Sequence, residues 1–309
     1  MKIRKDFMKK YEIVFLILHY QVIDETLRCI KSIKRKIDTQ HYHIVLVDNA
    51  SPNNSGNVLK EKFKNDEDVT VLLNKENLGF SGGNNIGFQY AKKQLGCDFI
   101  CMMNNDTEII QDNFFSIIKN EYERSHFAVL GPEIHLKDGS ICKYPKHILK
   151  LNEIDNDRKR VKKLLIKNKL FIESSYLFLY KYIGKLIHWK QIRHHFREEI
   201  IPDPRMENVR LHGCCMIFSP VYINKFDGLD NRTHFYGEED ILFVQLIRNH
   251  MKSVYDPSLK IFHCEEAATG AAMGKDYKKR RFIYEKHLET LEMLEKLYQE
   301  DLKSLKGYI

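Results

Sequence analysis

Apolar runs of strand length alternate with helix-prone segments along the first third of the chain. The strand-like runs are residues 12–18, 43–47, 69–73 and 98–103, and helix-prone segments near residues 25–37, 58–63 and 87–93 follow the first three. The runs are rich in β-forming residues, whereas Leu27, Ile30, Ile33 and Ile37 recur at helical spacing. This alternation predicts an α/β fold with a mostly parallel central sheet and helices on both faces.

The rest of the chain separates into parts of different composition. Residues 210–263 contain short strand-like runs around 214–218 and 253–255 and a helix-prone segment near 239–248. Residues 275–302 are predicted to be helical, with four leucines from Leu288 to Leu297 along one side. We therefore predict four parts: an α/β part at 11–145, a basic helical insertion at 146–200, a second α/β part at 201–270 and a helical tail at 271–309.

The net charge of +8 is concentrated in the basic insertion. Residues 146–197 hold 14 Lys and Arg against four Asp and Glu, which leaves 36 against 38 for the rest of the chain. Lys and Arg alternate there with Leu, Ile, Phe and Tyr, a pattern typical of a solvated helical lobe or of a surface that contacts an anionic membrane. Nucleic-acid binding is disfavoured, because no nucleic-acid motif accompanies the charge.

Other features indicate a cytoplasmic protein, at most peripheral to a membrane. The apolar run after the basic start is shorter than a signal-peptide core. The longest apolar stretch, 171–189, is broken by charges and falls short of the roughly 18 uninterrupted residues of a membrane span. The seven cysteines include no CxxC pair, which indicates core positions in a reducing compartment.

Polar residues follow the predicted strands at their carboxyl ends, where ligands bind in parallel sheets. The segment Asn104-Asn-Asp-Thr-Glu108 directly follows a strongly apolar strand. A carboxylate there can bind a hard divalent cation, which can neutralise a diphosphate leaving group. The alternative is a plain turn or a helix cap.

A glycine-rich segment, residues 77–87, precedes a helix-prone stretch. Glycines let the backbone approach a ligand, and amides at a helix start bind anionic oxygens, although a flexible loop has the same composition. The segment fits neither the dinucleotide fingerprint nor the P-loop pattern.

Three carboxylates, Glu238, Glu239 and Asp240, precede an apolar helix. His263 follows a late strand-like run, where taken alone a surface or hydrogen-bonded histidine is the commoner interpretation. Acidic residues stabilise a helix start in any case, but one of these can also serve as a general base.

Taken in order, these segments resemble family 2 glycosyltransferases of GT-A fold, in particular rhamnosyltransferase-like and polysaccharide-building members. The series covers residues 11–270 and consists of Val47-Asp-Asn-Ala-Ser51, Asn77-Leu-Gly-Phe-Ser-Gly-Gly-Asn-Asn-Ile-Gly87, Met103-Asn-Asn-Asp-Thr-Glu108, His212-Gly-Cys-Cys-Met-Ile217, Phe235-Tyr-Gly-Glu-Glu-Asp240, and Asp256-Pro with His263.

The resemblance implies a site for a nucleoside-diphosphate sugar and a divalent cation, Mn²⁺ or Mg²⁺. It implies that residues 11–145 bind the nucleotide sugar and that residues 201–270 form the acceptor side and supply the catalytic base. Asp106, the last acid of the DXD-type motif, and His263 would hold the cation, and Asp240 would be the catalytic base with Glu239 in reserve. The residues expected to line the nucleotide-sugar pocket are His19, Tyr20, Asp48, Asn77, Gly79, Gly82, Gly83, Asn84, Asn104 and Asn105.

The implied reaction is an inverting transfer to a hydroxyl of a glycan or lipid-linked glycan in cell-envelope polysaccharide synthesis. Asn104 departs from the family, since an amide replaces the first carboxylate of the triplet. This keeps open a degenerate member that binds without turnover. A sugar-phosphate nucleotidyltransferase is disfavoured, because Leu18-His-Tyr-Gln21 replaces the Gly-rich basic motif expected after its first strand.

Overall fold

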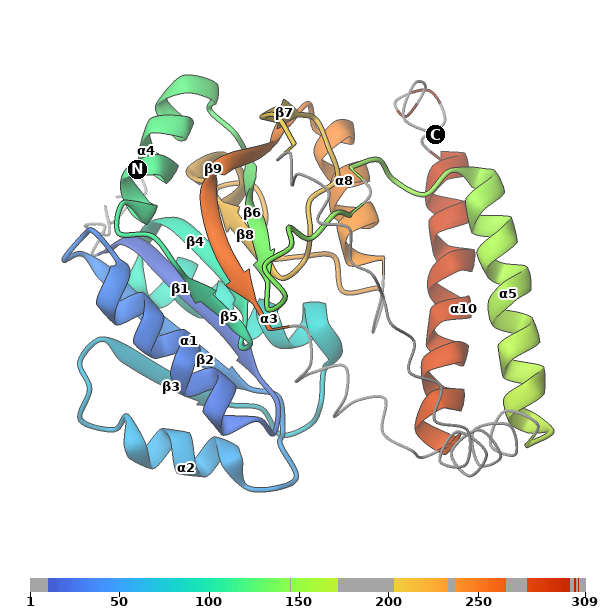
Figure 1. Ribbon diagram of the computed structural model, residues 1–309, viewed down its shortest axis with the longest axis horizontal. Coiled ribbons are helices and arrows are strands. Elements are labelled where there is room, and N and C mark those ends of the chain that lie inside the picture. Colours follow the sequence, from blue (N-terminus) through green and yellow to red (C-terminus); the bar gives the residue numbers. More distant parts are fainter. Residues whose placement is uncertain are drawn as a thin grey trace, which may run out of the picture.

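The computed structural model describes residues 11–144, 146–171, 203–232, 237–264 and 277–300, together with Lys303 and Leu305. These residues form one curved sheet covered by helices on both faces, with a pair of long helices beside it (Figure 1). The part of the predicted basic insertion that follows residue 171 lies outside the described residues.

The sheet is parallel in its first half and mixed beyond. The strands run in the order β3-β2-β1-β4-β8-β6-β9-β5, with β7 paired to β9. Strands β3, β2, β1 and β4 are parallel, β8 lies antiparallel to β4 and β6, and β9 lies parallel to β6. The bounds are β1 Tyr11–His19, β2 Tyr42–Asp48, β3 Val69–Leu73, β4 Cys97–Asn104, β5 Thr107–Ile109, β6 Val129–Leu136, β7 Met206–Glu207, β8 Cys215–Phe218 and β9 Ser253–His263.

Alternate residues of each central strand enter different cores. In β1, Ile13, Phe15 and Ile17 pack on one face of the sheet, whereas Val14 and Leu16 pack on the other. The first face is covered by α1 Ile23–Lys36, α2 Ser55–Lys62 and α4 Phe114–Ser125, and the second by α3 Gly79–Tyr90 with its π-helical extension Ala91–Leu95, α7 Pro220–Ile223 and α8 Glu238–Arg248. Both faces of the sheet are therefore apolar, which explains the continuous apolar strand sequences.

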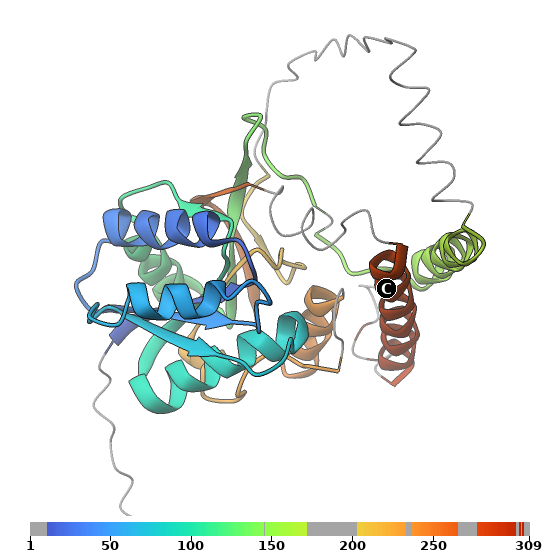
Figure 2. The ribbon, with the colours of Figure 1, turned by 90° about the horizontal axis from the view of Figure 1, so that it is seen from below.

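Helices α5 (Leu151–Lys169) and α10 (Tyr277–Glu300) lie side by side in both ribbon views (Figures 1 and 2). Apolar side chains of the two helices form a third core, which also receives Ile241, Phe243 and Val244 of α8. The ion pair Arg158–Glu295 and the contact of His287 with Asp157 join the two helices. The predicted tail and part of the predicted insertion thus fold together, and α8 links them to the sheet.

The sequence predicted the four parallel strands, α1, α8, α10 and the α/β class, all of which are confirmed. Strand β6 and helix α4 were not predicted, and the second half of the sheet is more mixed than the alternation indicated. Within the described residues, no helix is both long enough and apolar enough to cross a membrane.

Candidate active site

Three neighbouring parallel strands end side by side in polar residues. Strand β1 ends at His19, β2 at Asp48 and β4 at Asn104. In the sheet register His19 lies opposite Asp48, and Leu18 lies opposite Asn104. The strand ends that the sequence predicted to gather ligands therefore lie along one edge of the sheet.

His19 is fully buried below this edge. The only hydroxyl proton of Thr26 is donated to the carbonyl of Val22, so in the 2.7 Å contact with Thr26 Oγ1 the donor is His19 Nδ1. In the neutral ring Nε2 then carries no proton, and it accepts a hydrogen bond from Ser55 Oγ at 2.8 Å. Burial lowers the pKa of His19 to about 4, against the opposing effect of Asp48. The imidazole is therefore neutral, and neither ring nitrogen is free for a ligand.

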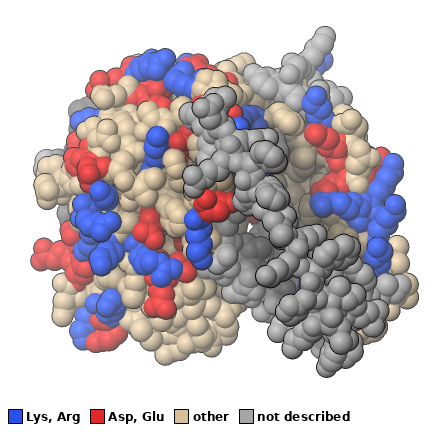
Figure 3. All heavy atoms as spheres, viewed as in Figure 1, with Lys and Arg blue, Asp and Glu red and all other residues tan. Residues whose placement is uncertain are grey.

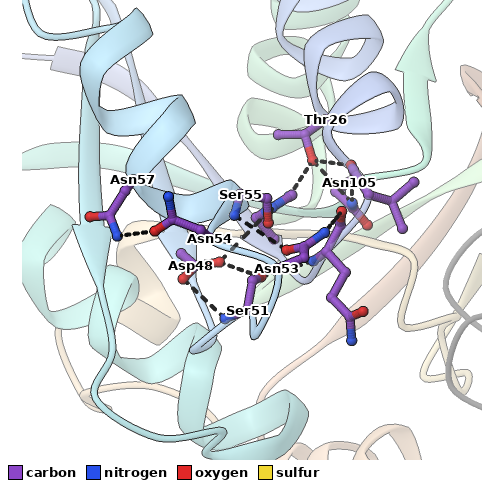
Figure 4. A network of polar contacts seen from close by, with 11 residues as sticks. Thr26, Asp48, Ser51, Asn53, Asn54, Ser55, Asn57 and Asn105 are labelled. Carbon is purple, nitrogen blue, oxygen red and sulfur yellow. Dashed lines mark hydrogen bonds and ion pairs between the residues drawn. The ribbon is translucent and has the colours of Figure 1, made fainter.

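Asp48 lies in a cradle of backbone and side-chain donors (Figure 4). Ser51 donates to it twice, from Oγ to Oδ1 at 2.5 Å and from the backbone N–H to Oδ2 at 3.2 Å. A Cβ at Gly56 would collide with this carboxylate, so only glycine leaves it room. Asp48 is thus held in a single position, and the partly exposed Tyr20 lies just beyond the end of β1.

Asn49 fixes the loop that enters α3. Its Nδ2 donates to Asn77 Oδ1 and to the carbonyl of Gly79, both at 3.0 Å, while its Oδ1 accepts from Asn74 Nδ2 at 3.1 Å and Leu78 N at 3.0 Å. The glycine-rich segment is therefore an ordered helix start rather than a flexible loop.

The first turns of α3 combine small residues with unsatisfied polar atoms. Gly83 packs so closely on Leu18 and Asn49 that a Cβ there would collide with Leu18, whereas Gly82 is partly exposed. Ser81 Oγ and Asn84 Oδ1 are buried without a hydrogen-bond partner among the residues described. These two oxygens at the start of α3 are therefore able to form further hydrogen bonds.

In the turn after β4, the side chains of Asn104 and Asn105 differ in their exposure to solvent. Asn105 is buried, and its Nδ2 donates to Thr26 Oγ1 of α1 at 3.0 Å (Figure 4). Thr107 Oγ1 closes the turn by donating to the carbonyl of Asn104 at 2.6 Å. Asn104 is partly exposed, so of the two asparagines it is the one open to a ligand.

Asp106 faces His263, the residue predicted to act with it. Strand β5 pairs with β9 so that Thr107 lies opposite His263, which brings Asp106 Oδ1 to 3.2 Å from His263 Nε2. Both residues are less than a tenth exposed, and within the described part of the chain Asp106 Oδ1 accepts no hydrogen bond. The fold thus brings together two residues that are far apart in the sequence.

This pair fits a divalent cation chemically. A buried carboxylate oxygen without a hydrogen bond, beside an imidazole nitrogen, is an oxygen and nitrogen donor set that Mn²⁺ accepts. No group of three His, Cys, Asp or Glu side chains suited to a metal occurs among the described residues. A cation such as Mg²⁺ commonly takes one or two protein ligands and completes its shell with phosphate oxygens and water. Two ligands therefore suffice for a cation that arrives with a diphosphate.

Glu239 and Asp240, at the start of α8, differ sharply in accessibility. Both oxygens of Asp240 are engaged, Oδ1 by the N–H of Leu149 at 2.9 Å and Oδ2 by Arg210 Nε at 3.1 Å, and the residue is 1% exposed. Burial raises the pKa of Asp240, although Arg210 opposes the shift. Glu239 accepts from Gly213 N at 3.2 Å and from Arg210 Nη2 at 3.3 Å, and its side chain is 20% exposed.

His212 completes a row of polar side chains that we call the polar row: Asp106, His263, His212 and Glu239. The ring of His212 lies 6.1 Å from that of His263 between centroids, and the next residue, Gly213, donates to Glu239. Burial lowers the pKa of His212 to about 4, although Glu239 opposes the shift. The sequence pointed to His212 only as part of a motif, and it gave no signal for Arg210.

Among the comparisons with known proteins, a family model gives the family and solved structures give the fold. The family model described as glycosyl transferase family 2 matches residues 14–186, more than half of the chain. No curated protein sequence matches the chain.

Solved structures of similar fold cover most of the chain at low identity. S. aureus TarS 1–349 is similar over 96% of this chain and 72% of that chain, with a TM-score of 0.51 and 11% identity. GalNAc-T7 with UDP, GalNAc and Mn²⁺ is similar over 93% of this chain and 48% of that chain, with a TM-score of 0.55 and 12% identity. These two likenesses agree with the predicted GT-A-type fold.

A third match covers less of each protein. S. aureus TarS 1–349 in complex with UDP-GlcNAc aligns over 45% of this chain and 38% of that chain, with a TM-score of 0.36 and 18% identity. The aligned part therefore spans well under two thirds of that chain.

Proposed function

The chain belongs to glycosyl transferase family 2, and on this premise we propose that it is an inverting, metal-assisted glycosyltransferase. It would move a hexose or deoxyhexose from a nucleoside-diphosphate sugar to a hydroxyl of a glycan or lipid-linked glycan. The observation that supports this most directly is the polar row, in which the Asp106–His263 pair and Glu239 lie at the same edge of the sheet.

The nucleotide would bind along the ends of β1, β2 and β4. Asp48, fixed by Ser51, would accept hydrogen bonds from the base or ribose, with Tyr20 beside it. Asn104 and the start of α3, including Asn77, Gly79, Gly82, Gly83 and Asn84, would face the ribose and the diphosphate. The sequence placed His19 and Asn105 among the residues that line the nucleotide-sugar pocket. Because both are buried and hydrogen-bonded, we propose instead that they hold Ser55 and Thr26 in place.

Asp106 and His263 would hold the divalent cation. When bound, the cation would neutralise the charge that develops on the departing diphosphate. The unsatisfied Asp106 oxygen supports this assignment, because a buried carboxylate without a hydrogen bond is costly unless a cation or other partner compensates it. GalNAc-T7, a protein of similar fold, has been solved with UDP and Mn²⁺.

Glu239 is the better candidate for the catalytic base, in place of Asp240, the first choice from sequence. A base must lie within hydrogen-bond reach of the hydroxyl proton that it removes, and Asp240 has almost no exposed surface. Glu239 would take the proton from the acceptor hydroxyl, whose oxygen would then attack the anomeric carbon opposite the departing diphosphate. Asp240 would hold Arg210, which in turn orients Glu239.

The membrane-facing role of the basic insertion and a place at the inner face of the cell membrane remain part of the proposal. So does the rhamnosyltransferase-like branch of the family. Helix α5 supports a membrane contact, because Lys162, Lys163 and Lys167 are exposed beside Ile166, which is 57% exposed, and Leu170, which is 62% exposed.

A thermal-stability screen tests the donor site. We expect one nucleotide sugar among UDP-GlcNAc, UDP-glucose, GDP-mannose and dTDP-rhamnose to raise the Tm in the presence of Mn²⁺, because a ligand that binds only the folded state stabilises it. The rise should be larger than with the same donor in a chelator. No rise with any donor would contradict the nucleotide-sugar site. A donor that raises the Tm but is neither transferred nor hydrolysed would favour the alternative of a degenerate family member that binds without catalysis.

A further inference from the structure

His212 has one ring nitrogen occupied and one available. The backbone N–H of Cys214 donates to His212 Nδ1 at 3.1 Å, which closes a short turn within the chain. A nitrogen that accepts a hydrogen bond carries no proton, so in the neutral ring the proton is on Nε2. His212 therefore presents Nε2–H as a fixed donor.

This donor has no partner within the described residues. The ring of His212 makes edge contacts with Tyr144 at 5.1 Å and His263 at 6.1 Å between centroids, and no acceptor for Nε2 is found. The residue is partly exposed, and Nε2 is not among the buried atoms that lack a partner, so Nε2 is open to solvent.

The position of the ring within the polar row indicates what it contacts. The ring contacts that of His263, in the proposed diphosphate and cation corner, and the adjacent Gly213 donates to Glu239, the proposed base for the acceptor. In a single displacement the transferred sugar lies between the leaving diphosphate and the attacking hydroxyl. A donor close to both ends is therefore within reach of the sugar.

We infer that the Nε2–H of His212 donates a hydrogen bond to a hydroxyl or ring oxygen of the transferred sugar and so helps to select and orient it. The turn bond from Cys214 acts in support, because it sets the tautomer that makes Nε2 the donor. The inference rests on the proposed function and assigns His212 a direct contact with the substrate.

Two substitutions separate the donor from the turn. In His212→Asn the side-chain oxygen can still accept from the N–H two residues on, as asparagine does in an Asx turn, but no group replaces Nε2–H. In His212→Gln the amide nitrogen reaches the position of Nε2, but the turn bond is lost. The readouts are Tm and kcat/KM for hydrolysis of the panel donor that the wild-type chain hydrolyses fastest in Mn²⁺, together with the Kd of its nucleoside diphosphate.

We expect His212→Asn to keep the wild-type Tm and the Kd of the nucleoside diphosphate, while kcat/KM falls about tenfold, the size expected for one lost hydrogen bond. His212→Gln should lower the Tm and keep kcat/KM within about threefold of wild type.

Three outcomes would overturn the inference while the proposed function stands: wild-type kcat/KM in His212→Asn, an equal loss in both variants, or a weaker Kd for the nucleoside diphosphate in His212→Asn. The first would show no role, the second a structural role, and the third a contact with the diphosphate. A wild-type chain that neither binds nor hydrolyses any donor would overturn the proposed function and this inference together.

Discussion

At the scale of single residues, adjacent carboxylates in the sequence have different roles in the fold. Glu239 and Asp240 are neighbours on α8, yet only Glu239 has appreciable exposure, whereas Asp240 is 1% exposed and bonded through both oxygens. The sequence could not separate them, because the order of residues around a helix start does not reveal which side chain meets a buried arginine.

The first prediction follows from this difference. Glu239→Gln should lower kcat at least about a hundredfold, the lower range for loss of a general base, while the nucleotide Kd and the Tm stay near wild type. Asp240→Asn should mainly lower stability, by about 1–3 kcal/mol, because the half-buried pairing of Arg210 then rests on Glu239 alone. The measurements are kcat, the nucleotide Kd and the Tm of both variants. A stable, inactive Asp240→Asn beside an active Glu239→Gln would restore Asp240 as the base.

The second prediction concerns His19 and pH. Its pKa is about 4 in the fold and near 6.5 when unfolded, so between these values the unfolded state binds more protons and stability falls as the pH falls. The full effect is about 3 kcal/mol, lost progressively from pH 7 to pH 4. In His19→Gln, the free energy of unfolding should fall less steeply over this range.

His41 offers a matched control for that measurement, because it is an exposed histidine. His41→Gln should leave the slope unchanged. An unchanged slope in His19→Gln as well would show that His19 does not cause the acid sensitivity.

At the scale of helices and strands, the continuous apolar runs allowed the parallel strands of the sheet to be predicted from the sequence. The predicted strand at 69–73 coincides with β3, and the other three parallel strands differ by a residue or two at their ends. Strand β6 was missed because Gly131 and Pro132 interrupt its pattern, and the structure has a register shift after Pro132. Such irregular strands depend on their neighbours and leave a weak local signal.

The site was predictable in its parts but not in its assembly. The strand-end motifs identified Asp48, Asp106 and His263, since sequence order alone carries that resemblance. The meeting of Asp106 with His263 depends on the pairing of β5 with β9, which are far apart in the chain. The burial of His19 and Asn105 likewise depends on α1 packing over the strand ends.

The third prediction tests how α3 is seated on the sheet. A Cβ at Gly87 would collide with the side chains of Leu16 and Val47. The backbone of α3 therefore packs directly against the side chains of β1 and β2 at this point. Gly87→Ala should destabilise the fold by about 1–3 kcal/mol despite the better helix propensity of alanine. Gly82→Ala serves as the control, because its Cβ would only come close to Leu78. Chemical denaturation that showed equal stability for both variants would contradict this packing.

At the scale of the whole molecule, helix α5 carries an excess of basic side chains beside the sheet. Helix α5 carries seven Lys and Arg against three acidic residues, and Figure 3 shows basic side chains gathered at the edge where this helix lies. The α5–α10 pair therefore presents a basic, partly apolar surface beside the sheet.

The fourth prediction is that this surface binds anionic vesicles. Binding should be stronger to vesicles that contain anionic lipid than to neutral ones, by about 1 kcal/mol per lysine at the surface. The triple change of Lys162, Lys163 and Lys167 to Glu should abolish the difference. Changing Lys60, Lys62 and Lys75 to Glu alters the net charge equally but lies elsewhere, and should have little effect. Equal co-sedimentation with neutral vesicles would contradict an electrostatic contact.

The measurement that tests the central claim most directly is cation-dependent turnover of a nucleotide sugar by the wild-type chain and by Asp106→Asn. We expect the chain to release nucleoside diphosphate from one donor of the panel in Mn²⁺, to stop in excess chelator, and to recover when the cation is restored. Asp106→Asn should keep its fold, judged by Tm, and lose most of this activity, because an amide cannot supply the charged ligand. Turnover that persists in chelator, or that is unchanged in Asp106→Asn, would contradict the claim that Asp106 and His263 form the metal corner of a glycosyltransferase site.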